Sequence, residues 1–160
     1  MTRIVTAVRI RRPIDAVFAY ATTPRNWPAW HPASVSVEGG DHPCLVGEEA
    51  VEEFVAAGRR GRATWRVTHR QAPHRWRIET ESREARAAVE YRLRAEGGET
   101  LFERELSYQV SGSWLALQDL LLLRRRMDRE SRLALQNLKA VLEARTPQGS
   151  GRRPEAASAP

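Results

Sequence analysis

Four polar side chains stand out because an alternating strand pattern predicts that they face the protein interior: His69, Tyr91, Arg104 and Tyr108. A buried imidazole, phenol or guanidinium must find a hydrogen-bond partner, so such residues are unusual in a simple core and typical of a ligand pocket. These groups could bind an oxygen-bearing ligand. They could also act in acid/base catalysis, with the guanidinium stabilising negative charge on a substrate. They are therefore candidate catalytic residues and candidate ligand contacts.

Arg104 requires an answering group, because an unpaired buried guanidinium is costly. The answer is either an inward glutamate or a carboxylate, carbonyl or phosphate on a ligand. The segment GEEAVEEFVAAG places Glu49 and Glu53 on one face and Glu48 and Glu52 on the other, so a glutamate can face inward in either register. Both answers are compatible with the sequence.

The other candidates also have structural alternatives. His69 could be a strand-end histidine bonded to a tyrosine or to the backbone. Tyr91 and Tyr108 could donate to a ligand carbonyl or could simply pack. We expect no metal site, since the four histidines and the single cysteine, Cys44, show no repeated ligand spacing.

Strands and short helices must position these side chains. Alternation over the first eleven residues predicts a half-buried strand, and Pro13 favours a short helix over residues 13–22. Prolines limit the following TPRNWPAWHP to one more short helical turn. Further strands are predicted at about 33–39, 47–57, 61–71, 75–82, 86–96 and 99–110. Their short connections predict an antiparallel meander.

The chain from Trp114 to Ala144 contains neither glycine nor proline, and its apolar residues recur at helical spacing. This pattern predicts one long helix. Trp114, Leu117 and Leu121 form a second apolar stripe on it, which either lines a cavity or meets a partner. Residues 146–160 carry no large apolar side chain, so we expect a disordered tail after a single domain of residues 1–145.

The stretch RIRRPIDAVFAYATTPRNWPAWHP precedes the meander, and LQNLKAVLEAR closes the final helix. This arrangement resembles the SRPBCC superfamily of START-like and birch-pollen-allergen-like proteins, and within it the polyketide cyclase/dehydrase-type branch. The resemblance covers residues 3–145. It implies an α+β helix-grip fold: a seven-stranded antiparallel sheet curled around the long C-terminal helix, with two short helices after the first strand. It also implies an apolar cavity between sheet and helix, and no obligatory cofactor.

The inward positions and the proline-rich turn supply the expected wall of that cavity. The predicted ligand contacts are Trp27, Trp65, Val67, His69, Trp76, Ile78, Tyr91, Phe102, Arg104, Tyr108, Leu117 and Leu120. We expect the protein to bind a small hydrophobic molecule, such as a lipid, an isoprenoid or a polyketide-like compound. The alternative is a cofactor-independent polyketide cyclase or dehydrase that uses acid/base catalysis in the same cavity. Binding is favoured because the sequence shows no paired carboxylate and no nucleophile with an adjacent base.

The net charge of +6 comes from 26 basic and 20 acidic residues, and most arginines alternate with glutamates along predicted strands. This pattern is typical of a solvated sheet face, so we expect no nucleic-acid partner. The run LLLLRRR, from Leu120 to Arg126, is compatible with contact with an anionic membrane, a homodimer contact or a solvated helix turn. The amino terminus lacks the apolar stretch of an export signal, so we expect a cytoplasmic protein.

Overall fold

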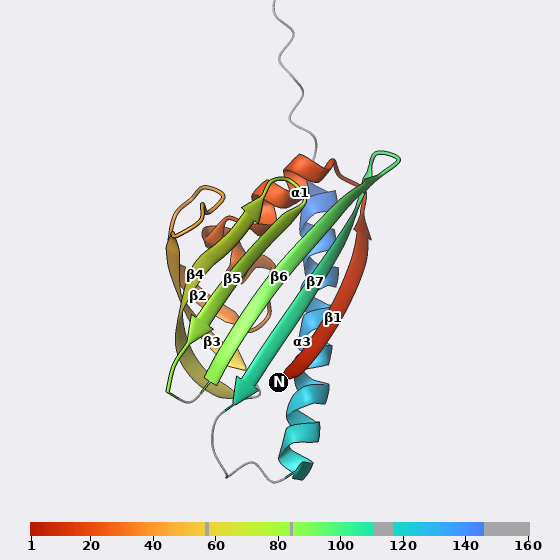
Figure 1. Ribbon diagram of the computed structural model, residues 1–160. Helices are drawn as coiled ribbons and strands as arrows, with labels where there is room; N and C mark the ends of the chain where they lie inside the picture. Colours follow the sequence, from red (N-terminus) through yellow and green to blue (C-terminus); the bar gives the residue numbers. More distant parts are fainter. Residues whose placement is uncertain (57, 84, 111–116, 146–160) are drawn as a thin grey trace, which may run out of the picture.

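The computed structural model describes residues 1–56, 58–83, 85–110 and 117–145, in which one sheet curls around a long helix (Figure 1). The strands are β1 (Thr2–Ile10), β2 (Ser34–Glu38), β3 (Glu49–Ala56), β4 (Arg59–Gln71), β5 (Arg75–Glu81), β6 (Ala85–Glu96) and β7 (Glu99–Val110). The helices are α1 (Ile14–Ala21), the 3₁₀ turn η1 (Pro24–Asn26), α2 (Trp27–Trp30) and α3 (Leu117–Ala144). The predicted helix-grip fold is confirmed. Trp114 and the predicted tail, 146–160, lie outside the described residues.

The sheet is antiparallel throughout, in the order β1-β7-β6-β5-β4-β3-β2. Strands β2 to β7 follow one another as hairpins, whereas β1 joins the far side of β7. Gly97 and Gly98 form the turn between β6 and β7 with φ angles of 58° and 88°. Both angles lie in the left-handed region, which glycine adopts without steric cost, so this two-residue connection is possible.

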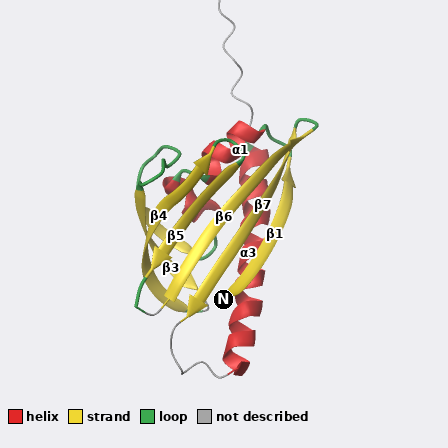
Figure 2. Ribbon diagram, in the orientation of Figure 1, coloured by secondary structure: helices red, strands yellow, loops and turns green. Residues whose placement is uncertain are grey.

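Helix α3 lies across the concave face of the sheet, and its C-terminal half is tied to neighbouring elements (Figure 2). Asn137 Nδ2 donates to the Trp30 carbonyl oxygen at 3.2 Å, which links α3 to α2. Lys139 Nζ donates to the Arg9 carbonyl oxygen at 2.6 Å, which links α3 to β1. These bonds fix the helix over the end of β1 and over the short helices.

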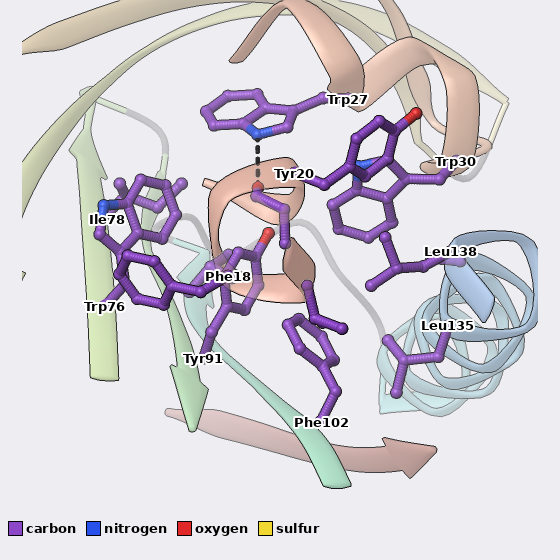
Figure 3. Packing of buried hydrophobic residues seen from close by; sticks show 14 of the residues in the cluster. Phe18, Tyr20, Trp27, Trp30, Trp76, Ile78, Tyr91, Phe102, Leu135 and Leu138 are labelled. Carbon is purple, nitrogen blue, oxygen red and sulfur yellow. Dashed lines mark hydrogen bonds between the residues drawn. The ribbon is translucent and has the colours of Figure 1, made fainter. Parts of the chain in front are cut away.

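Aromatic side chains form the centre of the packed core (Figure 3). Trp76 stacks on Tyr91 with ring centroids 5.2 Å apart, and Tyr91 meets Phe102 at 5.0 Å. Trp27 lies edge-on to Trp76 at 6.3 Å, and its Nε1 donates to the Ala21 carbonyl oxygen. Such aromatic pairs contribute about 0.5–1.5 kcal/mol each beyond their burial, so this cluster stabilises the closed fold.

The outer face of the sheet carries opposite charges across neighbouring strands, as the alternating arginines and glutamates predict. Glu90 is only 3% exposed and accepts from Arg75 at 3.0 Å, Arg77 at 3.3 Å and Arg92 at 2.7 Å. Three cations therefore surround this carboxylate. Without them, an ionised carboxylate this deeply buried would be costly.

The strict alternation assumed for residues 61–71 is interrupted, and the expected inward direction of His69 is wrong. The β4–β5 register shifts between Val67 and His69, a β-bulge that inserts one extra residue. Before the shift Val67 pairs with Ile78, and after it His69 pairs with Arg77 on the outer face. The next residue, Arg70, takes the inward position and lies over the Phe18 ring at 5.6 Å.

Candidate functional site

A cavity of about 300 Å³ lies between the sheet and α3. The strands contribute Trp65, Ile78 and Tyr91 to its wall, and α3 contributes Leu123 and Met127. Apolar side chains dominate this wall, with a few polar groups at intervals. This composition is typical of a site that binds a small molecule through its hydrocarbon part and orients it through a few polar contacts.

The structure distributes the predicted ligand contacts over several environments. Those in the cavity wall are Trp27, Trp65, Ile78, Tyr91, Arg104 and Tyr108. Val67, Trp76 and Phe102 lie beside the cavity in the packed core, and His69 faces away from it. The side chains of Leu117 and Leu120 lie outside the described part of the chain. Direct contact of the wall residues with a ligand stays a prediction.

Arg104 is the polar centre of the cavity wall. Its side chain is 5% exposed, and its Nη1 donates to Ser131 Oγ at 2.7 Å. Nη2 lies 3.1 Å from His31 Nε2. A guanidinium only donates hydrogen bonds, so His31 Nε2 must be the acceptor and its proton must lie on Nδ1. Arg104 thus joins β7, α3 and the segment after α2.

The buried cation determines the state of His31. Burial, aided by the charge of Arg104, lowers the pKa of His31 from 6.5 to about 3. The imidazole is therefore neutral over the physiological range. Its Nδ1 is buried and has no hydrogen-bond partner among the described residues. His31 is a neutral partner for Arg104 that leaves the guanidinium charge uncompensated.

Glu52 is the inward glutamate that the sequence of β3 allows. It is 8% exposed, lines the cavity and accepts a hydrogen bond from Trp65 Nε1 at 2.8 Å. Burial raises its pKa, although the charge of Arg104 acts in the opposite direction. No ion pair joins Glu52 to Arg104, nor does Arg104 pair with any other carboxylate in the described ranges. Within the described residues, the inward glutamate therefore forms no ion pair with the buried guanidinium.

The two cavity tyrosines remain protonated at neutral pH. Burial raises the pKa of Tyr91 to about 12, against the opposing effect of the Arg104 charge. Burial also raises the pKa of Tyr108. Both phenols can therefore donate hydrogen bonds, but neither forms a phenolate readily. The cavity combines a cation, a carboxyl group and neutral donors around an apolar space.

Sequence reasoning missed the roles of Ser131 and His31. Ser131 lies four residues after Met127 and three before Ala134, so it interrupts the apolar face of α3. A polar residue on that face is a signal that could have identified it. His31 lies in the proline-rich segment TPRNWPAWHP, and no periodic pattern there marks it as a partner of Arg104.

In the described part of the Leu120–Arg126 run, some side chains face the cavity and others face solvent. Leu123 lines the cavity, whereas Leu122 is 53% exposed and Arg124 and Arg125 are exposed. Contact of this run with a membrane or with a second copy of the chain stays a prediction. Among the described residues, no helix is long and apolar enough to cross a membrane.

The curled sheet and the long helix that lies across it define the helix-grip class of fold. The family described as "Polyketide cyclase / dehydrase and lipid transport" matches residues 1–143, and the chain belongs to this family. No curated protein sequence matches the chain.

Solved structures share the fold at low sequence identity. TTHA0849 from Thermus thermophilus has a TM-score of 0.76 and 16% identity, over 89% of this chain and 98% of that chain. A START superfamily protein from Mycobacterium smegmatis has a TM-score of 0.70 and 11% identity, over 88% and 97%. The di-domain ARO/CYC BexL from the BE-7585A biosynthetic pathway has a TM-score of 0.69 and 20% identity, over 89% and 47%. These likenesses show the fold alone.

Proposed function

We propose that this protein binds a small, mainly apolar molecule in the cavity between the sheet and α3, with an oxygen atom of the ligand at Arg104. The observation that carries the proposal is the state of this guanidinium. It is buried in the cavity wall and bonded to Ser131 and His31, both neutral. A ligand carbonyl or carboxylate would accept its remaining N–H groups.

The size and wall of the cavity narrow the ligand class. A volume of about 300 Å³ lies at the lower end of the usual range for ligand pockets. We therefore expect a short lipid, a small isoprenoid or a compact polyketide-like compound rather than a long-chain phospholipid. The family description, which names lipid transport beside polyketide cyclases, supports this class of ligand.

Native mass spectrometry of the purified protein, followed by titration with decanoate, tests the proposal. We expect decanoate to bind, and Arg104→Met to weaken this binding about tenfold or more, because a charge-assisted hydrogen bond is lost. Arg66→Met, at an exposed arginine that lies outside the cavity wall and pairs with Glu49, is the matched control and should bind normally. If neither native mass spectrometry nor titration finds an apolar ligand, the proposal fails. If Arg104→Met unfolds, Arg104 has a structural role.

Acid/base catalysis is the second candidate, and the position of Glu52 favours it. A proton-transferring group works best when its pKa lies near the working pH. The pKa values of His31 and Tyr91 lie far from neutrality, whereas burial shifts that of Glu52 upward. A cyclase or dehydrase would use Glu52 for proton transfer and Arg104 to stabilise negative charge. Conversion of a linear poly-β-ketone by the wild type, but not by Arg104→Met with an intact fold, would favour this candidate.

A further inference from the structure

The cavity wall holds a second buried charge besides Arg104. Glu52 is 8% exposed, and it accepts a hydrogen bond from Trp65 Nε1, a neutral donor. In the part of the chain that the structure describes, no ion pair involves this carboxylate. Buried carboxylates are normally paired with cations, because the loss of hydration is otherwise uncompensated. Among the described residues, Glu52 therefore has no cation at ion-pair distance.

Arg104 has the complementary deficit in the same cavity. Arg104 donates hydrogen bonds to Ser131 Oγ and His31 Nε2, and neither acceptor carries a negative charge. The two opposite charges influence each other electrostatically but form no ion pair. Each is held by its own neighbours, Glu52 by Trp65 on β4 and Arg104 by α3 and the segment after α2. The wall of one cavity thus holds a cation and a carboxylate that form no ion pair with each other.

We propose that Glu52 and Arg104 together select a ligand whose polar end carries two kinds of oxygen. One is a carbonyl or carboxylate oxygen that accepts from Arg104, and the other is a hydroxyl group that donates to Glu52. The ligand class is then a hydroxy acid or hydroxy ketone with an apolar chain. A plain fatty acid satisfies Arg104 alone, and a plain alcohol satisfies Glu52 alone. This inference rests on the proposed binding function and deepens it.

The rest of the wall accommodates the apolar part of such a ligand. Ile78, Val89 and Leu106 come from three adjacent strands, and Leu123 and Met127 come from α3 opposite them. A hydrocarbon chain between these two layers leaves water when it binds, which contributes roughly 0.8 kcal/mol for each buried methylene. The apolar wall therefore supplies affinity, whereas the two charged groups supply selectivity.

Isothermal titration with decanoate, 2-hydroxydecanoate and 3-hydroxydecanoate tests the proposal. The three acids share one chain length, and the hydroxyl group lies one or two carbons from the carboxylate. We expect at least one hydroxy acid to bind the wild type about tenfold or more tightly than decanoate, as a hydrogen bond to a charged group predicts. Glu52→Gln should reduce this preference to about threefold or less without weakening decanoate binding.

Glu53→Gln is the matched control, because Glu53 is exposed beside Glu52 and should not affect the preference. If Glu52→Gln does not fold, Glu52→Ala replaces it with the same expectation. If the wild type binds all three acids with equal affinity, the inference is overturned and the proposed function stays intact. Equal affinity would mean that the hydroxyl group only replaces an ordered water molecule at Glu52. Equal weakening of all three acids by Glu52→Gln also overturns it. If no acid binds, the proposed function itself fails.

Discussion

Replacement of His31 by glutamine should change how stability depends on pH. In the unfolded chain this imidazole gains a proton near its ordinary pKa of 6.5, but in the folded protein it does so only near pH 3. Between these values the unfolded state therefore binds more protons, so the free energy of unfolding falls as the pH falls. Above about pH 6.5 both states hold a neutral imidazole, and the contribution of His31 to the pH dependence disappears.

The magnitude follows from the interval between the two pKa values. About pH 5 lies about 1.5 units below the ordinary pKa of His31. Protonation of the unfolded state therefore lowers the free energy of unfolding by about 2 kcal/mol at this pH. For a protein of 160 residues this loss lowers the melting temperature by roughly 4–8 °C relative to neutral pH. Between about pH 7 and about pH 5, the free energy of unfolding of His31→Gln should fall by about 2 kcal/mol less than that of the wild type, since a glutamine does not titrate.

Urea unfolding at a series of pH values, followed by tryptophan fluorescence, measures this difference. The raised pKa of Glu52 has the opposite effect on the pH dependence, but it is present in both proteins and cancels in the comparison. Parallel curves for the wild type and His31→Gln between about pH 7 and about pH 5 would refute the buried, neutral state of His31.

Two further predictions concern the attachments of α3. Ser131→Val leaves a buried guanidinium N–H without its 2.7 Å partner and should lower the free energy of unfolding by about 1–3 kcal/mol, measured by urea titration; a change below about 0.5 kcal/mol contradicts the role of this bond. Glu143→Gln should cost about 1–2 kcal/mol near neutral pH, because the backbone of Arg11 and the side chain of Lys139 hold the pKa of Glu143 at about 2. This folded-state pKa is depressed, so the difference between the two proteins should shrink as the pH falls from about 4.5 to about 2, and a constant difference would argue against it.

The arrangement of helices and strands could be predicted from the sequence because it depends on local periodicity. The absence of glycine and proline from Trp114 to Ala144 indicated the long helix, and two-residue alternation indicated each strand. Alternation also predicted that Tyr91 and Arg104 face inward, and both are buried in the cavity wall. These features follow from patterns within single segments of the sequence and do not depend on contacts between distant segments.

The details of the site depend on contacts between distant segments and could not be predicted in this way. The β-bulge at Val67–His69 reverses the direction of one candidate, and no residue type in WRVTHRQ marks its position. The segment after α2 brings His31 to Arg104 across 73 positions of sequence. The sequence alone does not show which face of β3 points inward, the one with Glu52 or the one with Glu53. The pairing of β3 with β4 decides it.

The concave face of the sheet is divided into a packed part, with Trp76 and Phe102, and a hollow part, with Ala63 and Ile78 facing Leu123. Side chains in the packed part carry most of the energy that resists unfolding, since truncation there opens a void in a close-packed interior. Side chains that border the hollow already lack neighbours on one side, so changes in their size alter the shape of the space more than the stability of the fold. Because of this separation, substitutions around the hollow can change its shape while the packed part keeps the fold stable.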